Sequence, residues 1–293
     1  MFLGAPLLGA GFGQFAWHHF LQQGASGATA APGVFNHAHN IVLHLMAETG
    51  VVGALIIVGA ALAWLGGLRH VKFDPAWWWL LSLLAVIGIH SLLEYPLWYA
   101  YFLGMAALLL GLGAERVFAL RLARAGHAVV GLGIIAGWLN LIGVLSPYRE
   151  FERLVFSSER PKPPVATEQD FAQALAKVHR EPLLVPYVEL AVAYGITPSK
   201  EKLTEKLELT TRAMRFAPVD VVVYRQALLL ALAGRAEAAR EQFERALRVY
   251  PEERPGVIAE LENLARRYPV ELTPLLELAT SNFTEGRVLQ KAK

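Results

Sequence analysis

The sequence predicts an all-helical protein in which a polytopic membrane part is followed by a soluble helical domain. Two observations support this fold class. The 293-residue chain is 55% hydrophobic with a mean hydropathy of +0.38, yet only five basic and four acidic side chains precede Pro147. The other 22 basic and 21 acidic side chains follow that point. Such a split is typical of an integral membrane part joined to a charge-balanced soluble part.

Four stretches lack Asp, Glu, Lys and Arg for long enough to cross about 30 Å of hydrocarbon. These predicted spans are Gly50–Leu68, Ala76–Leu93, Leu97–Ala114 and Ala128–Ser146. Only Glu94-Tyr95-Pro96 separates the second from the third, which predicts a tight turn. Trp and Tyr residues, Tyr95 and Trp98 among them, gather near the span ends, as in an interfacial aromatic belt.

The basic residues predict the orientation in the membrane. The five that precede Pro147 all lie in the loops after the first and third predicted spans: Arg69, Lys72, Arg116, Arg121 and Arg124. The positive-inside rule places these loops in the cytoplasm. The N-terminal loop and the C-terminal domain then lie outside, which for the inner membrane of a bacterium is the periplasm.

We therefore expect four regions. Residues 1–49 form a periplasmic loop, 50–146 the four-span domain, 147–167 a linker and 168–293 a periplasmic helical domain. Three prolines between residues 157 and 167 support the linker. The net charge of +2 includes no basic tract for nucleic acid, and the absence of cysteine excludes disulfides and thiolate metal sites.

The C-terminal domain carries a repeat pattern. Five residues have the offsets of the second half of a tetratricopeptide repeat (TPR): Gly234, Ala239, Phe243, Ala246 and Pro251. A weaker copy ends at Pro218, 33 residues earlier. The pattern predicts a short TPR-like domain that binds partners, with a plain helical bundle as the alternative.

The candidate chemistry lies in a histidine cluster next to the first span. A helix that begins near Asn40, capped by Asn40 or Asn36, places His44 and Glu48 one turn apart on one face. His39 then sits at the helix entrance. Its neutral imidazole, with an ordinary pKa of about 6.5, suits the acceptance of a proton from an attacking hydroxyl, and Glu48 would orient that histidine.

Three other interpretations stay open at this level. In the first, the histidines hydrogen-bond to lipid headgroups. In the second, His37, His39 and His44 bind a divalent metal together with Glu48. A single His-x-His pair is a weak metal signal. In the third, Asn40 and Gly50 are architectural, as a helix cap and a close helix contact.

Three motifs resemble the O-antigen ligase superfamily: Pro6–Phe15, Asn36–Gly50 and His90–Gly104. The third is similar to the bacterial protein O-oligosaccharyltransferases, the pilin-glycosylation ligases. The resemblance implies transfer of a glycan from undecaprenyl pyrophosphate, within membrane lipid, to a hydroxyl of a pilin-like or other periplasmic protein. It implies no cofactor and no metal.

The resemblance also implies roles for individual residues. His39 matches the essential loop histidine of the family, with His37 as the second candidate and Glu48 as the acid of the motif. Whether that histidine activates the acceptor or contacts pyrophosphate stays open. Four further residues are candidates for substrate binding: Asn40, His44, His90 and Glu94. His90 and Glu94 are four residues apart and are expected on one helix face.

The sequence departs from the family pattern in one respect, the absence of an arginine before the first motif. Family members carry an arginine just before the Pro-Leu-Leu-Gly motif, whereas residues 1–68 here contain no Arg or Lys. We therefore expect a C-terminal fragment that is inactive alone. The alternatives are a lipid A O-antigen ligase, an O-antigen polymerase, and a non-catalytic membrane-anchored repeat protein.

Overall fold

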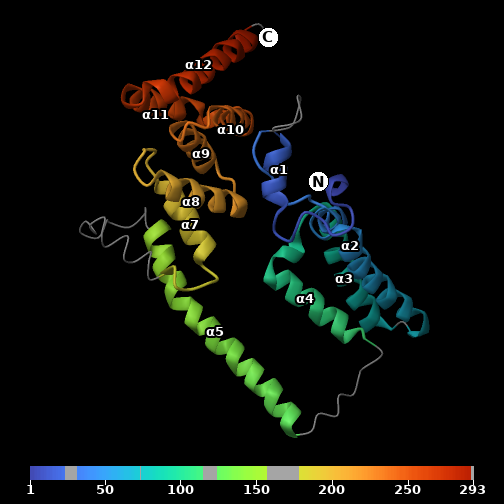
Figure 1. Cartoon of the computed structure of the whole chain (residues 1–293). Coiled ribbons are helices and arrows are strands. Elements are labelled where there is room, and N and C mark those ends of the chain that lie inside the picture. The colour runs from blue at the N-terminus through green and yellow to red at the C-terminus, as the bar shows by residue number, and fades with distance from the viewer. Residues whose placement is uncertain (24–31, 73, 115–123, 157–177, 292–293) are drawn as a thin grey trace. The chain divides into compact units, whose positions relative to one another are not determined.

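The computed structural model describes residues 1–23, 32–72, 74–114, 124–156 and 178–291, and every regular element within these ranges is a helix. The predicted all-helical class is therefore confirmed for the described residues. The chain divides into two compact units, Met1–Ala119 and Leu120–Lys293 (Figure 1).

The first unit carries the N-terminal motifs. Its α-helices are α1 (Phe15–Gln23), α2 (Ile41–Gly67), α3 (Pro75–Leu93) and α4 (Ala100–Leu112). Its 3₁₀ turns are η1 (Phe2–Gly4), η2 (Leu68–His70) and η3 (Pro96–Trp98). The predicted loop 1–49 is thus partly helical, because it contains α1 and the first two turns of α2.

Two side-chain contacts place α2 beside α3 and α4. At the start of α2, the Asn40 amide donates to the carbonyl oxygen of Leu92 near the end of α3, at 3.0 Å. Further along α2, the Trp64 indole donates to the carbonyl of Leu110 on α4, at 3.2 Å. The start of α2 therefore meets the end of α3.

Helix α2 is broken at Gly50, where φ is 67° and ψ is −170°. A helix break leaves backbone groups without partners, which is costly in hydrocarbon. The N-terminal segment 6–11 supplies those partners through backbone hydrogen bonds: Ala10 N–H to Ala47 O (2.9 Å), Gly11 N–H to Glu48 O (3.0 Å), Val51 N–H to Pro6 O (2.9 Å) and Val52 N–H to Leu7 O (3.3 Å). The N-terminal segment thus forms hydrogen bonds with α2 on both sides of the break at Gly50.

Three helical stretches among the described residues are long and apolar enough to cross a membrane: Ile41–Gly67, Pro75–Leu93 and Arg124–Arg153. The prediction of four spans is therefore not supported. Helix α4 has 13 residues, or about 20 Å, which falls short of the hydrocarbon thickness. The reason is local, because the turn η3 uses the first residues of the predicted third span.

The second unit begins with α5 (Arg124–Phe156), which continues through Pro147. Residues 147–156, predicted to be linker, are helical. The reason is burial, because Phe151 joins a hydrophobic core with Val178, Leu184 and Val188. The rest of the predicted linker, residues 157–167, lies outside the described residues.

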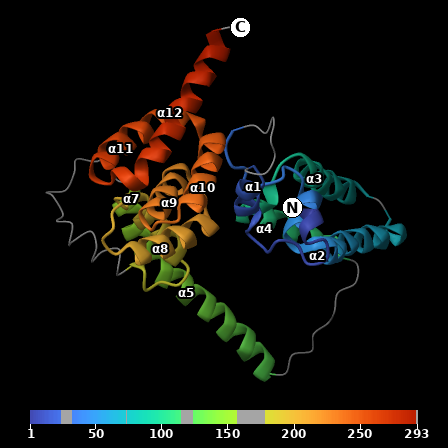
Figure 2. The same cartoon turned by 45° about the horizontal axis from the view of Figure 1, so that its top comes forward.

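The remaining helices of this unit pack mainly as consecutive pairs, α7 with α8, α9 with α10, and α11 with α12 (Figure 2). Their bounds are α7 Val185–Gly195, α8 Leu203–Phe216, α9 Asp220–Leu232, α10 Ala236–Val249, η5 Pro251–Glu253, α11 Arg254–Arg267 and α12 Pro269–Lys291. Gly234 makes the turn from α9 to α10 with a φ of 74°, and Phe243 and Ala246 are fully buried. Helical repeats have such pairs, and the TPR-like assignment stays a prediction.

Candidate functional site

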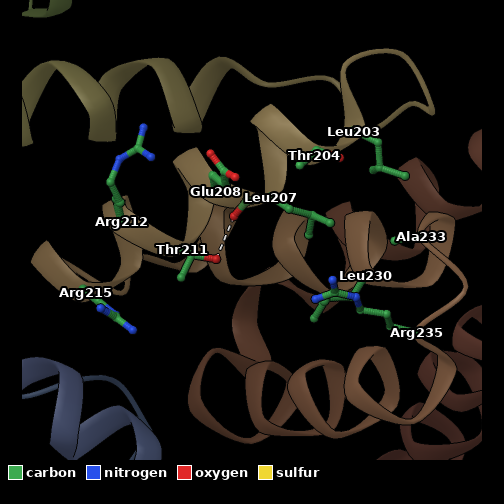
Figure 3. Close-up of a pocket in the computed structure, with 10 residues that line it drawn as sticks. All are labelled: Leu203, Thr204, Leu207, Glu208, Thr211, Arg212, Arg215, Leu230, Ala233 and Arg235. Atoms are coloured by element: carbon green, nitrogen blue, oxygen red, sulfur yellow. Dashed lines mark hydrogen bonds between the residues drawn. The ribbon is translucent and has the colours of Figure 1, made fainter.

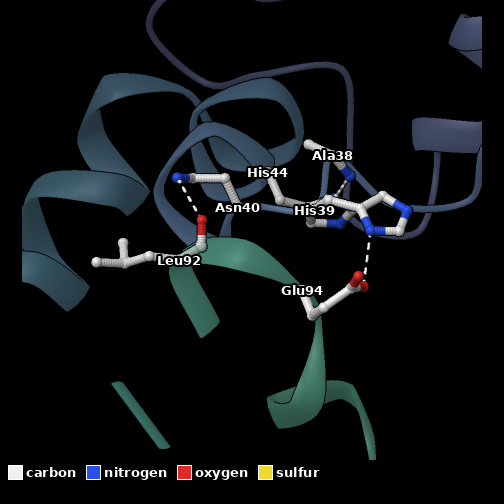
Figure 4. A network of polar contacts seen from close by, with 6 residues as sticks. All are labelled: Ala38, His39, Asn40, His44, Leu92 and Glu94. Atoms are coloured by element: carbon white, nitrogen blue, oxygen red, sulfur yellow. Dashed lines mark hydrogen bonds and ion pairs between the residues drawn. The ribbon is translucent and has the colours of Figure 1, made fainter. Parts of the chain in front are cut away.

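The loop that precedes α2 meets the end of α3 in a polar cluster (Figure 4). Asn40 caps α2, because its Oδ1 accepts the N–H groups of Val42 and Leu43, both at 3.1 Å. Its amide nitrogen simultaneously donates to Leu92. Both ends of the Asn40 amide are thus used within the protein, which favours an architectural role over the predicted substrate binding.

His39 forms the outer pair of the cluster with Glu94. Its Nδ1 lies 2.7 Å from Glu94 Oε2, and the two side chains are 46% and 48% exposed. A carboxylate only accepts hydrogen bonds, so Nδ1 carries the proton and neutral His39 keeps a lone pair on Nε2. That nitrogen faces away from Glu94 (Figure 4). The outer pair therefore presents a basic nitrogen on a half-exposed ring.

The backbone at His39 is also unusual. Its φ is 50°, in the left-handed region that non-glycine residues rarely adopt. Such conformations cost about 1–2 kcal/mol and persist where the surroundings enforce them. Here the cap at Asn40 and the contact with Glu94 fix the chain on one side of His39.

His44 and Glu48 form an inner pair. Their side chains are 4% and 3% exposed, and His44 Nε2 lies 3.4 Å from Glu48 Oε2, an ion-pair distance with poor hydrogen-bond alignment. Glu48 Oε1 accepts the N–H of Phe15 at 3.0 Å, at the start of α1. His44 Nδ1 accepts the N–H of Ala38 at 3.3 Å.

His37 lies against aromatic rings. It stacks on Tyr95 with ring centroids 4.3 Å apart, and its ring meets that of Trp98 edge-on at 5.3 Å. Burial lowers the pKa of His37 below its usual value, and the nearby imidazole of His44 lowers that pKa further. His37 is therefore neutral at pH 7, and its Nδ1 is buried without a hydrogen-bond partner among the described residues.

The structure revises two sequence predictions about this site. The carboxylate beside His39 is that of Glu94, whereas Glu48 contacts His44 and Phe15. His90 and Glu94 were expected on one helix face, but α3 ends at Leu93 and Glu94 is extended, with φ −145° and ψ −160°. The ring of His90 instead meets Phe102 edge-on at 6.0 Å.

The cluster surrounds a recess of about 10 Å³, lined by residues that include His37, His39, His44, Glu94 and Trp98. This volume is below the roughly 300–1,000 Å³ of ligand pockets. A large ligand would therefore contact the site at its open edge. Among the described residues, no three His, Asp or Glu side chains gather closely enough to hold a metal ion.

Three residues of the site were not predicted from the sequence. Tyr95 and Trp98 were assigned to the aromatic belt, and Phe15 was not singled out. The Phe15 ring stacks on His44 at 4.9 Å, and Trp98 meets His44 edge-on at 4.4 Å. One sequence feature could have identified Tyr95 and Trp98 as site residues. Both follow Glu94 within four positions, inside the third motif.

A second concavity lies on the helical region of the second unit (Figure 3). This groove has a volume of about 640 Å³ and is lined by α8, the end of α9 and the turn after it. Its charged residues are Glu208, Arg212, Arg215 and Arg235. Arg212 pairs with Glu189 at 2.8 Å, whereas within the described part of the chain Arg215 and Arg235 form no ion pair. The groove therefore carries a positive excess.

Comparison with known proteins places the sequence in a family. The sequence profile of the family described as virulence factor membrane-bound polymerase, C-terminal, matches residues 78–260, more than half of the chain. The matched region contains Glu94, Tyr95 and Trp98, and His39 precedes it.

A curated relative is similar over a shorter stretch. The general O-oligosaccharyltransferase of Acinetobacter baylyi is 42% identical over 82 residues, which are 27% of this chain and 14% of that protein. The matched part of this chain thus spans about one seventh of the length of that relative. No solved structure matches the chain.

The family match covers the third of the three motifs that carry the resemblance, His90–Gly104. The chain belongs to the family of virulence factor membrane-bound polymerases, C-terminal, and with it to the oligosaccharyltransferase branch of the O-antigen ligase superfamily.

Proposed function

We propose that the chain carries the histidine centre of a membrane glycosyltransferase. The protein would transfer an oligosaccharide from undecaprenyl pyrophosphate to a Ser or Thr hydroxyl of a pilin-like or other periplasmic protein. The observation that carries this proposal is the 2.7 Å contact between His39 Nδ1 and Glu94 Oε2. A carboxylate behind an imidazole fixes the tautomer and stabilises the imidazolium that forms when the other nitrogen accepts a proton.

In the proposed step, Nε2 of His39 accepts the proton of the acceptor hydroxyl. The hydroxyl oxygen forms a bond to the anomeric carbon of the glycan. The bond from that carbon to the phosphate oxygen breaks, and lipid pyrophosphate leaves with the electron pair. Attack opposite the leaving group inverts the anomeric centre. A general base contributes about 10²–10⁴-fold to the rate of such a step.

The leaving pyrophosphate gains negative charge and requires cationic stabilisation. Residues 1–68, which contain His39, have no Lys or Arg. In this proposal the cation therefore comes from outside that stretch. The positive-inside distribution of basic residues supports a periplasmic position for the site, in the inner membrane.

The helical region would dock the acceptor protein. The support is the groove on α8 and α9, where Arg215 and Arg235 are unpaired among the described residues. Charge reversal in the double variant Arg215→Glu, Arg235→Glu should weaken modification of an acceptor with an acidic segment. The matched control is Arg266→Glu on α11, an exposed position outside the groove.

The decisive experiment replaces His39 with Ala in the complete protein and measures glycan transfer to proteins in membranes. We expect a loss of about 10²–10⁴-fold with an unchanged amount of protein in the membrane. His18→Ala, on α1, is the matched histidine control. Normal transfer by the His39 variant would refute the role of the base.

The same experiment separates the alternatives. Loss of glycan on lipid A with normal protein glycosylation would indicate a lipid A ligase, and shortened glycan chains would indicate a polymerase. A non-catalytic anchor protein predicts that His39→Ala has no effect while the groove variant loses partner binding.

A further inference from the structure

The inner pair lies too deep to act on a large ligand. His44 and Glu48 are almost completely buried, whereas the side chains of His39 and Glu94 are half-exposed. We infer that His44 and Glu48 are positioning residues, which hold the loop before α2 so that His39 meets Glu94. The inference rests on the proposed function for its effect on transfer, although its structural part is testable without any substrate.

The pair connects three separate segments of the first unit. Glu48 on α2 accepts the N–H of Phe15, at the start of α1. His44, one turn earlier on α2, accepts the N–H of Ala38 in the loop. Because Ala38 directly precedes His39, the hydrogen bond to His44 fixes the backbone on the side of His39 that Asn40 does not.

The chemistry of the contacts defines the tautomer of His44. A backbone N–H only donates, so the hydrogen bond from Ala38 requires an unprotonated Nδ1. The proton of neutral His44 then lies on Nε2, which faces the carboxylate of Glu48 at 3.4 Å. Protonation of Nδ1 would displace the N–H of Ala38. The hydrogen bond from Ala38 therefore requires that Nδ1 of His44 carry no proton.

Packing holds that ring in one orientation. Phe15 stacks on one face of His44 at 4.9 Å, and Trp98 meets the ring edge-on at 4.4 Å. A ring clamped in this way keeps Nδ1 aimed at Ala38. The left-handed backbone of His39, with φ of 50°, is unfavourable by itself. Loss of the Ala38 hydrogen bond should let His39 relax, and its Nδ1 would then leave Glu94.

Hydrogen–deuterium exchange on the full chain in lipid nanodiscs tests the structural part. His44→Phe keeps an aromatic ring but removes the acceptor, and we expect the Ala38 amide to exchange roughly tenfold faster. His44→Gln offers an acceptor and a donor on one amide and should keep exchange close to that of the unchanged protein. Unchanged exchange of Ala38 in His44→Phe would overturn the inference.

If the His44→Phe variant does not fold, the His44→Gln variant still tests the positioning role. Glutamine does not titrate, so a positioning role predicts that His44→Gln retains transfer and the pH profile of the rate. Transfer as low as in His39→Ala, with protected Ala38, would show that His44 itself exchanges protons, against the inference.

Failure of the two proposals is distinguishable. If the His39→Ala variant transfers glycan normally, the proposed function is refuted, but the result of the exchange experiment is unaffected. If the His39→Ala variant is inactive while the His44→Phe variant is fully active, only the positioning role of His44 is refuted.

Discussion

Gly9 and Gly50 allow two backbones to touch at the break in α2. A Cβ atom on Gly50 would lie 2.2 Å from the carbonyl oxygen of Leu7, and one on Gly9 would lie 2.3 Å from the carbonyl carbon of Glu48. Both glycines have positive φ, of 67° and 74°. The contact between the N-terminal segment and the break in α2 therefore tolerates no side chain at Gly9 or at Gly50. Glu48 of the inner pair lies directly beside this contact.

Gly50→Ala should therefore destabilise the first unit by roughly 2–4 kcal/mol, because the new methyl group clashes with backbone and the required φ is strained. Thermal unfolding of the protein in detergent measures this effect. Gly59→Ala is the matched control, since a Cβ there meets nothing within 4 Å and alanine favours the helix by about 0.5–1 kcal/mol. Equal unfolding temperatures for the two variants would contradict the proposed close contact.

Glu94→Gln should slow glycan transfer by roughly 10–100-fold, because the amide still accepts the N–H of His39 but no longer stabilises the imidazolium by charge. The measurement is the transfer rate as a function of pH. Exposed ion pairs contribute only about 0–1 kcal/mol to folding, so the unfolding temperature should change little. A wild-type rate in this variant would remove Glu94 from the proposed mechanism.

Local rules predicted the parts of the site that depend on neighbours in sequence. A cap at Asn40 and the one-turn spacing of His44 and Glu48 follow from helix geometry alone. The partner of His39 did not follow from it, because Glu94 is 55 residues away and leaves its helix at Leu93. Only the packing of α2 against α3 brings the two side chains together.

The fold shows the same division. The hydropathy of the sequence predicted membrane helices. It predicted neither the break at Gly50 nor the turn η3 that shortens α4. The predicted linker began at Pro147, directly after the fourth predicted span, and proline usually interrupts helices. Burial of Phe151 in a core with distant residues outweighed that local preference.

Phe151→Ala should loosen the junction between α5 and the helical region of the second unit. The side chain is 7% exposed and packs with Val178, Leu184 and Val188, and truncation of a buried Phe costs about 3–5 kcal/mol. Limited proteolysis at Arg153, in the last turn of α5, should become faster. Tyr148→Ala, at a position 47% exposed on the same helix, is the control and should cleave as the unchanged protein does. Equal cleavage of both variants would mean that α5 is not anchored by Phe151.

Acidification should destabilise the first unit through His37. Burial, followed by the effect of His44, lowers the pKa of His37 below 6.5, with Glu48 opposing and His39 adding to this shift. Between the lowered folded pKa and about 6.5, the unfolded chain binds more protons than the folded one, so the free energy of unfolding falls as pH falls. Burial lowers the pKa of His19 as well, which adds a slope of the same sign.

His37→Phe isolates the contribution of His37 to this pH dependence. Phenylalanine retains a flat ring against Tyr95 and Trp98 but takes up no proton. Unfolding temperatures measured from pH 7.5 to pH 5.5 should therefore decline less steeply in the variant, with the slope of His19 remaining. Above about pH 7.5 both His37 and its replacement are neutral, so the difference between the two proteins should be constant there. A variant that loses stability with acid as steeply as the unchanged protein would show that His37 takes up its proton equally well in the folded state.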